Sequence, residues 1–132
     1  MSSLMNTNAF DYINVLEKAA DSSWMRNDAI ANNLANVDTP GYKRQDVDFE
    51  TQLAHALKNS RYTSMDKRVA NINMSRLNPL CYTDYASFSY RLDGNNVDVD
   101  TEGVYLAKNQ ITYQGLERSI AQEFKNLQTV MK

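Results

Sequence analysis

Acidic side chains at alternate positions are the first feature of this sequence that could carry chemistry. Asp98, Asp100 and Glu102 precede Gly103, a spacing that resembles the start of a calcium-binding loop. Such a loop needs a bidentate glutamate at its twelfth position, where this chain has Asn109. Carboxylates at the start of a helix cap its free N–H groups and favour its dipole. We therefore interpret the run as a helix N-terminus and not as a metal site.

The other reactive side chains occur singly or without a recognisable partner. His55 is the only histidine and Cys81 the only cysteine, which excludes an internal disulfide and a Cys/His zinc site. No base accompanies Cys81, so we interpret it as a small packed thiol. Asp46, Asp48 and Glu50 alternate in a way that is typical of a solvated face. The sequence predicts no catalytic residue, no cofactor, no metal and no small-molecule substrate, and therefore no enzyme.

Charge and hydropathy exclude further classes. The 132 residues carry 14 basic and 16 acidic side chains, with no tail of one sign and no basic stripe that would indicate nucleic-acid binding. No apolar run approaches the ~20 residues that a membrane span needs. The N-terminus lacks the basic and apolar regions of a secretory signal, although export without signal cleavage stays open. We expect a single domain over 1–132.

Two long helices are expected to frame the chain, at 9–36 and 98–131. Each carries a narrow apolar stripe, which is more typical of a coiled-coil seam than of a globular core. In the second stripe, apolar residues recur every seven positions from Leu106 to Leu127. We predict that the two stripes pack against each other in an antiparallel, coiled-coil-like hairpin. The residues of this assembly seam are Ile13, Leu16, Ala20, Trp24, Leu34, Leu106, Tyr113, Leu116, Ile120, Phe124, Leu127 and Met131.

A sharp turn is expected after the first helix. Asn8 is a plausible N-cap of that helix, and Asn36 could end it in the left-handed conformation. Pro40 forces Thr39 out of the α region. Gly41 then fits the third position of a type II turn, where φ is positive. Residues 42–49 should leave this turn in an extended conformation.

The middle of the chain, at 37–97, is expected to be the turn followed by irregular or short-β structure. Apolar residues predict a short helix from 48 or 49 to 58, and alternation at 69–74 suggests one short strand. Residues 59–91 should otherwise be loops with, at most, a hairpin. The fold is thus mainly α, with two long helices whose shared core is too thin for good independent stability. Neighbouring copies would complete the burial, although the heptads alone also permit a closed dimer, as in a soluble helical adaptor or chaperone.

Two motifs flank this middle region. Asn33-Leu34-Ala35-Asn36, followed after two residues by Thr39-Pro40-Gly41-Tyr42, closely resembles the signature of the flagellar rod and hook proteins, the axial family of bacteria. The run at 44–49 and the helix entry Asp93-Gly94-Asn95-Asn96-Val97-Asp98 are similar to the proximal rod subunits of that family. Residues 59–91 match no motif of the family.

The resemblance implies a structural subunit of the proximal rod in the flagellar basal body, and therefore a role in motility. Such a subunit polymerises through its terminal helices into the drive shaft and lines the export channel. It leaves the cell unfolded through the flagellar type III apparatus, without signal cleavage, and assembles outside the cytoplasmic membrane. Its implied partners are copies of itself, adjacent rod subunits, the basal adaptor protein at the export gate and the export apparatus.

Overall fold

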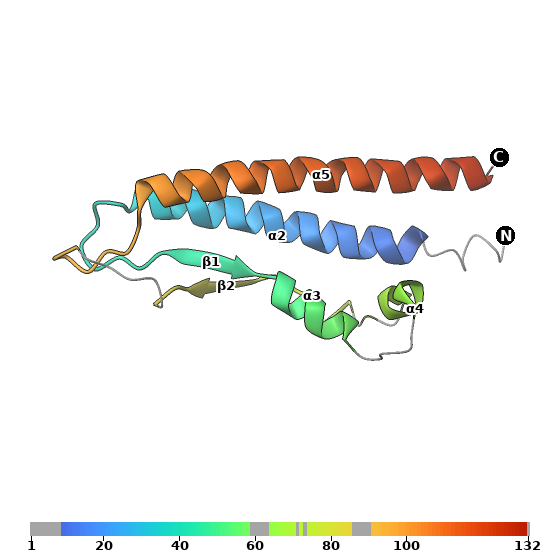
Figure 1. Ribbon diagram of the computed structural model, residues 1–132, viewed down its shortest axis with the longest axis horizontal. Helices are drawn as coiled ribbons and strands as arrows, with labels where there is room; N and C mark the ends of the chain where they lie inside the picture. Colours follow the sequence, from blue (N-terminus) through green and yellow to red (C-terminus); the bar gives the residue numbers. More distant parts are fainter. Residues whose placement is uncertain (1–8, 59–63, 71, 73, 86–90, 132) are drawn as a thin grey trace.

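The computed structural model describes residues 9–58, 64–70, 72, 74–85 and 91–131, and its main feature is a pair of long helices (Figure 1). Helix α2 spans Ala9–Ala35 and helix α5 spans Val99–Met131. They run side by side in opposite directions, so that the start of α2 and the end of α5 lie at the same end of the pair (Figure 1). The mainly α fold with an antiparallel helix pair is confirmed. Among the described helices, none is long and apolar enough to cross a membrane.

Helix α5 begins where the sequence places a cap. The Asp98 carboxylate accepts hydrogen bonds from the backbone N–H groups of Asp100 at 3.0 Å and Thr101 at 3.4 Å. This side chain therefore satisfies two N–H groups that have no partner within the helix. Asn8, the expected cap of α2, lies outside the described residues.

Helix α2 ends in a way that the sequence predicts only in part. Gly41 has a φ of +73°, and the Tyr42 N–H donates to the Thr39 carbonyl at 3.2 Å, as the type II turn requires. The expected left-handed Asn36 is wrong, because only glycines have positive φ in the described part of the chain. The side-chain oxygen of Asn36 instead accepts a hydrogen bond from the Thr39 hydroxyl at 3.1 Å, and this bond connects the end of α2 to the turn.

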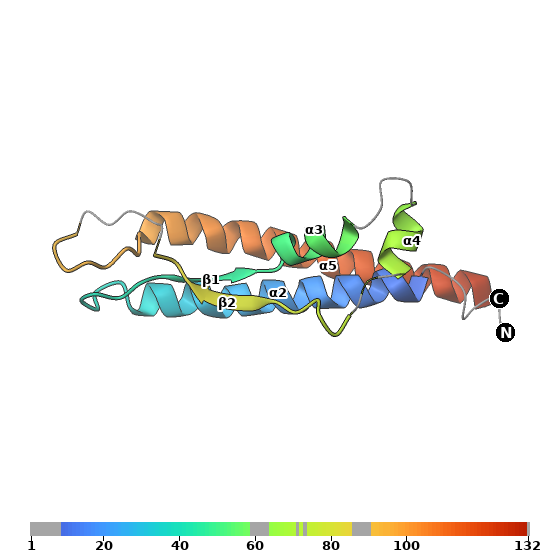
Figure 2. The same cartoon turned by 90° about the horizontal axis from the view of Figure 1, so that it is seen from below.

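A two-stranded antiparallel sheet follows the turn and lies along α2. Strand β1 (Gln45–Asp48) pairs with strand β2 (Leu80–Thr83), with Gln45 opposite Thr83 and Asp48 opposite Leu80. The extended segment after the turn is thus confirmed, and its partner comes from the middle region that the sequence left irregular. The sheet and the two short helices lie on one side of the long pair (Figures 1 and 2).

Helix α3 (Glu50–Leu57) confirms the short helix expected at 48–58 and covers a small core of Phe49, Ile72 and Leu77. The strand expected at 69–74 is wrong where the structure describes it. Val69 and Ala70 end helix α4 (Met65–Ala70). The Ser64 hydroxyl accepts the Lys67 N–H at 3.4 Å at the start of this helix, and this cap outweighs a short alternation of apolar residues.

Candidate functional site: a polar junction and an open helix seam

Asn33, the first residue of the sequence motif, is completely buried and joins three segments. Its side-chain oxygen accepts the Gln45 N–H at 2.8 Å and the Tyr42 hydroxyl at 3.2 Å. Its amide nitrogen donates to the Gln45 carbonyl at 2.9 Å and to the Glu102 carboxylate at 3.2 Å. An amide side chain has two donors and two acceptor sites, so every one is used. Asn33 therefore fixes α2 to the start of β1 and to the first turn of α5.

Asn95, from the helix entry, is also completely buried and closes the end of α2. Its amide nitrogen donates to the carbonyls of Asn36 at 2.9 Å, Val37 at 3.0 Å and Thr39 at 2.9 Å. Its oxygen accepts the Val97 N–H at 2.8 Å. These carbonyls follow directly after α2, and Asn95 adds a donor to each of them from a distant segment. The two sequence motifs thus complete each other.

The two glycines with positive φ bring the backbones of these motifs into contact. The Gly41 N–H donates to the Asp93 carbonyl at 2.7 Å. Gly94 has a φ of +78°, and a Cβ atom there would lie 3.9 Å from the Gly41 Cα atom. Lys43 also donates to the Gly94 carbonyl. Positive φ costs glycine little and other residues more, so both turns depend on this residue type.

A buried ion pair lies beneath the two motifs. The Arg44 Nε atom donates to the Glu102 carboxylate at 2.6 Å, and Glu102 is only 1% exposed. Arg44 also donates to Asp84 at 2.9 Å and lies 5.1 Å from the centre of the Tyr105 ring. Burial by itself lowers the pKa of Arg44, but the hydrogen bonds to Glu102 and Asp84 outweigh it and raise that pKa above its ordinary value. The guanidinium therefore stays charged and holds α5 to β1.

We call the cluster of Asn33, Arg44, Asn95, Asn96 and Glu102 the polar junction. Asn96 contributes by accepting the Arg44 N–H at 2.7 Å and donating to the Asp84 carbonyl at 2.8 Å. Sequence reasoning missed Arg44, Asn96 and Glu102 as a group. The available signal was their position, because Arg44 directly continues the turn motif and Glu102 is an acid in the first helical turn.

A second polar contact joins the two long helices farther along. The Ser23 hydroxyl donates to the Asn109 side-chain oxygen at 2.8 Å, and the Asn109 amide donates to the Ser23 carbonyl at 2.8 Å. Both residues are almost fully buried. Sequence reasoning missed this pair too, although Asn109 continues the three-and-four spacing between Leu106 and Tyr113. The pair fixes the axial register of α2 against α5.

The assembly seam is covered unevenly. Ile13 and Leu127 are buried, whereas Trp24 is 59%, Phe124 48% and Met131 69% exposed. The Trp24 and Tyr113 rings contact each other across the seam, with centroids 6.4 Å apart. The remaining members are half-buried: Leu16, Ala20, Leu34, Leu106, Tyr113, Leu116 and Ile120. The seam thus joins the two helices but leaves part of its apolar surface open.

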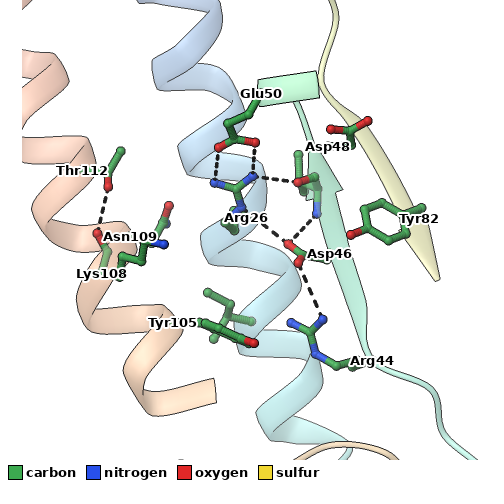
Figure 3. Close-up of a pocket in the computed structure, with 12 residues that line it drawn as sticks. Arg26, Arg44, Asp46, Asp48, Glu50, Tyr82, Tyr105, Lys108, Asn109 and Thr112 are labelled. Atoms are coloured by element: carbon green, nitrogen blue, oxygen red, sulfur yellow. Dashed lines mark hydrogen bonds and ion pairs between the residues drawn. The ribbon is translucent and has the colours of Figure 1, made fainter. Parts of the chain in front are cut away.

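A groove of about 320 Å³ runs between β1 and α5 above α2 (Figure 3). Arg26 donates to both oxygens of Glu50 at 2.9 Å and to the Val47 carbonyl at 2.7 Å. These bonds lower the pKa of Glu50 and raise that of Arg26. Asp46 lies 3.5 Å from Arg26, so two of the carboxylates expected on a solvated face also take part in ion pairs, and Glu50 stays exposed as expected. Their partners hold them in structural roles.

The remaining reactive side chains lie on the outside of the sheet region. Cys81 is exposed, with its sulfur 3.8 Å from the Gln45 side-chain oxygen, so the expected packed thiol is wrong for the subunit. The reason is that β2 is the outer strand and its residues 80–82 are all exposed. His55 is exposed on α3.

Comparison with known proteins identifies the family. The family model described as "Flagella basal body rod protein" matches residues 24–43. The flagellar basal body rod protein FlgB of Bacillus subtilis (strain 168) is 37% identical over 118 residues, which cover 88% of this chain and 89% of that protein. The chain belongs to the FlgB family. FlgB of Borrelia hermsii is 34% identical over 91% of this chain and 95% of its own. FlgB of Escherichia coli (strain K12) is 28% identical over 88% and 89%.

Membership of the FlgB family assigns a structural role in the proximal rod of the flagellar basal body and decides against the soluble adaptor or chaperone. The segment matched by the family model runs from Trp24 through the turn, and it contains Asn33 and Gly41. It ends one residue before Arg44. The family pattern therefore covers the second half of α2 and the turn, and it contains one residue of the polar junction, Asn33.

Proposed function

We propose that this FlgB-family subunit polymerises through the open part of its seam and thereby builds the proximal rod. The observation that carries the proposal is the exposure of Phe124 and Met131 toward the end of α5 and of Trp24 in the middle of α2. Burying apolar surface releases roughly 25 cal/mol per Å². Large aromatic side chains left exposed on a rigid helix pair are therefore available to drive contacts between subunits.

The proposal extends to the route and the partners of the chain. The subunit is exported unfolded by the flagellar type III apparatus, without signal cleavage, and reaches its place outside the cytoplasmic membrane. There it contacts copies of itself, adjacent rod subunits and the basal adaptor protein at the export gate. The thin core of a two-helix pair supports this route, because a marginally stable subunit is easily kept unfolded.

We also propose that the chain has no catalytic activity. The groove in Figure 3 supports this, because Arg26 pairs with the carboxylates of Asp46 and Glu50. The third carboxylate of the groove, Asp48, accepts the Thr51 N–H at 3.4 Å. A general acid or base must be free to reach a substrate proton. These carboxylates instead bind groups of the fold.

Sedimentation velocity of the purified chain over a range of concentrations tests polymerisation. An open, heterologous contact gives species that grow with concentration, whereas a closed dimer stops growing. Phe124→Asp places a charge on the open seam and should reduce this growth. Asn126→Asp adds the same charge at an exposed position outside the seam and should leave it unchanged. Growth that stops at the dimer, or that is as strong in Phe124→Asp as in Asn126→Asp, would contradict the proposal.

A further inference from the structure

We propose that neighbouring copies make a second contact, in which the outer face of α5 packs against the outer face of α2 in the next copy. This inference rests on the proposed polymerisation and adds the surfaces that would carry it. Apart from Trp24, which also contacts Tyr113 across the assembly seam, the residues of the two faces lie outside that seam. They are defined here as the α2 outer stripe and the α5 outer stripe.

The α2 outer stripe follows a three-and-four spacing and is exposed throughout. Trp24 is 59% and Phe10 46% exposed, so two large aromatic rings lie open on one side of α2. Asp21 lies two residues before the buried Ser23, which is roughly half a turn around the helix. The members of the stripe are Phe10, Asn14, Glu17, Asp21, Trp24, Asp28, Ala31 and Ala35.

The α5 outer stripe has the same spacing and is also exposed throughout. Val104 is 64% and Ile111 72% exposed, although both are apolar. Ile111 lies two residues before Tyr113 of the seam, again roughly half a turn away. The members of the stripe are Val104, Ala107, Ile111, Gln114, Arg118, Ala121 and Lys125. Heptad spacing on two faces of one helix is expected where the helix packs against two others.

The charges of the two stripes are opposite. Glu17, Asp21 and Asp28 are the charged members on α2, and Arg118 and Lys125 are those on α5. None of the five takes part in an ion pair with the described residues of its own subunit. Within one copy, like charges on each stripe repel; between copies, the stripes attract.

The register inside the subunit sets which residues would meet. The bond between Asn33 and Glu102 places these two residues at the same level of the antiparallel pair. Trp24 lies nine residues before Asn33, and Ile111 lies nine residues after Glu102, so the two are also at the same level. A neighbour in the same orientation, without axial shift, therefore brings these two apolar residues side by side.

One heptad from Trp24 and Ile111 in either direction, the pairing continues. On one side Glu17 comes level with Arg118, and on the other Ala31 comes level with Val104. At these three levels, spaced by one heptad, acid meets base once and apolar meets apolar twice. Because each copy offers one stripe to each neighbour, the contact is heterologous, and it can repeat beyond a dimer. The occupant that fits each stripe is a second copy of this chain.

Disulfide cross-linking tests the contact in isolated basal bodies. In a chain with Cys81→Ser, Trp24→Cys and Ile111→Cys are combined, and the assembled rods are oxidised. A disulfide needs Cα atoms within about 7 Å, which facing positions of packed helices reach and the two outer faces of one subunit do not. We expect covalent dimers and higher oligomers from the double variant, and none from either single variant.

A matched pair of Trp24→Cys and Lys67→Cys, with the second cysteine at an exposed site on α4, should give no oligomers. Oligomers from this control, dimers alone from the test pair, or a link to a different polypeptide would overturn the proposed contact. A chain that is present in basal bodies but gives no cross-link would overturn this contact and leave the rod function standing. A chain that is absent from basal bodies would overturn both.

Charge reversal supplies an independent measurement by sedimentation. Glu17→Arg or Arg118→Glu alone should weaken self-association about fivefold, which corresponds to ~1 kcal/mol per surface pair. The double reversal should restore the original association, whereas Lys67→Glu should not change it. A double variant that is weaker than both single variants would contradict the pairing of these two residues.

Discussion

The two ends of the helix pair are held together by different forces. At the polar junction, Asn33 and Asn95 are completely buried and make four hydrogen bonds each. At the opposite end, Phe124 and Met131 lie on the seam with about half or more of their surface exposed. Hydrogen bonds demand a defined direction, whereas apolar burial does not. The junction can therefore fix one geometry, and the open end can accept another subunit.

The largest effect should come from removing a charge at the junction. Glu102→Ala removes charged hydrogen bonds to both Arg44 and Asn33, each worth roughly 1.5–3 kcal/mol, although Asp84 still pairs with Arg44. Urea denaturation followed by circular dichroism measures the loss. Asp100→Ala, two residues earlier and exposed, should change stability by less than about 0.5 kcal/mol. Equal losses in the two variants would show that the junction does not hold the subunit.

Asn95→Ala should follow, with a loss of roughly 1–3 kcal/mol, because the buried Val97 N–H loses its acceptor and the carbonyls of residues 36, 37 and 39 each lose one of their donors. Hydrogen exchange should report the change locally, as faster exchange near the end of α2. Asn126→Ala, on the exposed face of α5, removes the same side chain without such an effect. Unchanged protection in Asn95→Ala would mean that the turn holds itself without the helix entry.

Gly41→Val should cost about 1–3 kcal/mol, because its φ of +73° strains a β-branched residue. The nearest atom to an added Cβ is 3.9 Å away, so the cost is in the backbone and not in a clash. We expect the variant to be exported but to assemble poorly, and to give a non-motile strain. Gly103 lies within α5, and no atom lies within 4 Å of an added Cβ there, so Gly103→Ala should instead stabilise α5 by about 1 kcal/mol. A motile Gly41→Val strain would show that the turn tolerates other geometries.

The smallest effect should come from acidification. The bonds from Arg26 lower the pKa of Glu50 below its ordinary value of 4.5 in the folded state. The carboxylate therefore contributes stability above pH 4.5, and this contribution is lost as the pH falls through the lower folded value. Because Glu50 is largely exposed, the contribution should be below about 1 kcal/mol. Glu50→Gln should reduce the slope of stability against pH in this window, and an unchanged slope would exclude this ion pair as its source.

The contrast between apolar stripes and long-range hydrogen bonds also explains which parts of the structure the sequence could predict. Spacing of apolar residues predicts α2 and α5, because a stripe on one helix is a local property. Pro40 and Gly41 predict the turn for the same reason. The bond between Asn33 and Glu102 joins residues 69 positions apart, and no local pattern contains it. The strand prediction at 69–74 failed because this short alternation did not outweigh the helix cap at Ser64. The prediction of a packed Cys81 failed because its exposure depends on a strand pairing that the sequence did not indicate.

The separation of the junction residues along the chain also governs when the subunit can fold. Arg44 and Glu102 are 58 residues apart. At a synthesis rate of ~5–20 residues per second, roughly three to twelve seconds pass between the appearance of the arginine and that of its glutamate. During this interval Asn33 and Arg44 both lack the Glu102 carboxylate that they share. The nascent chain therefore has a built-in delay before it can close, during which a carrier can capture it in an extended state.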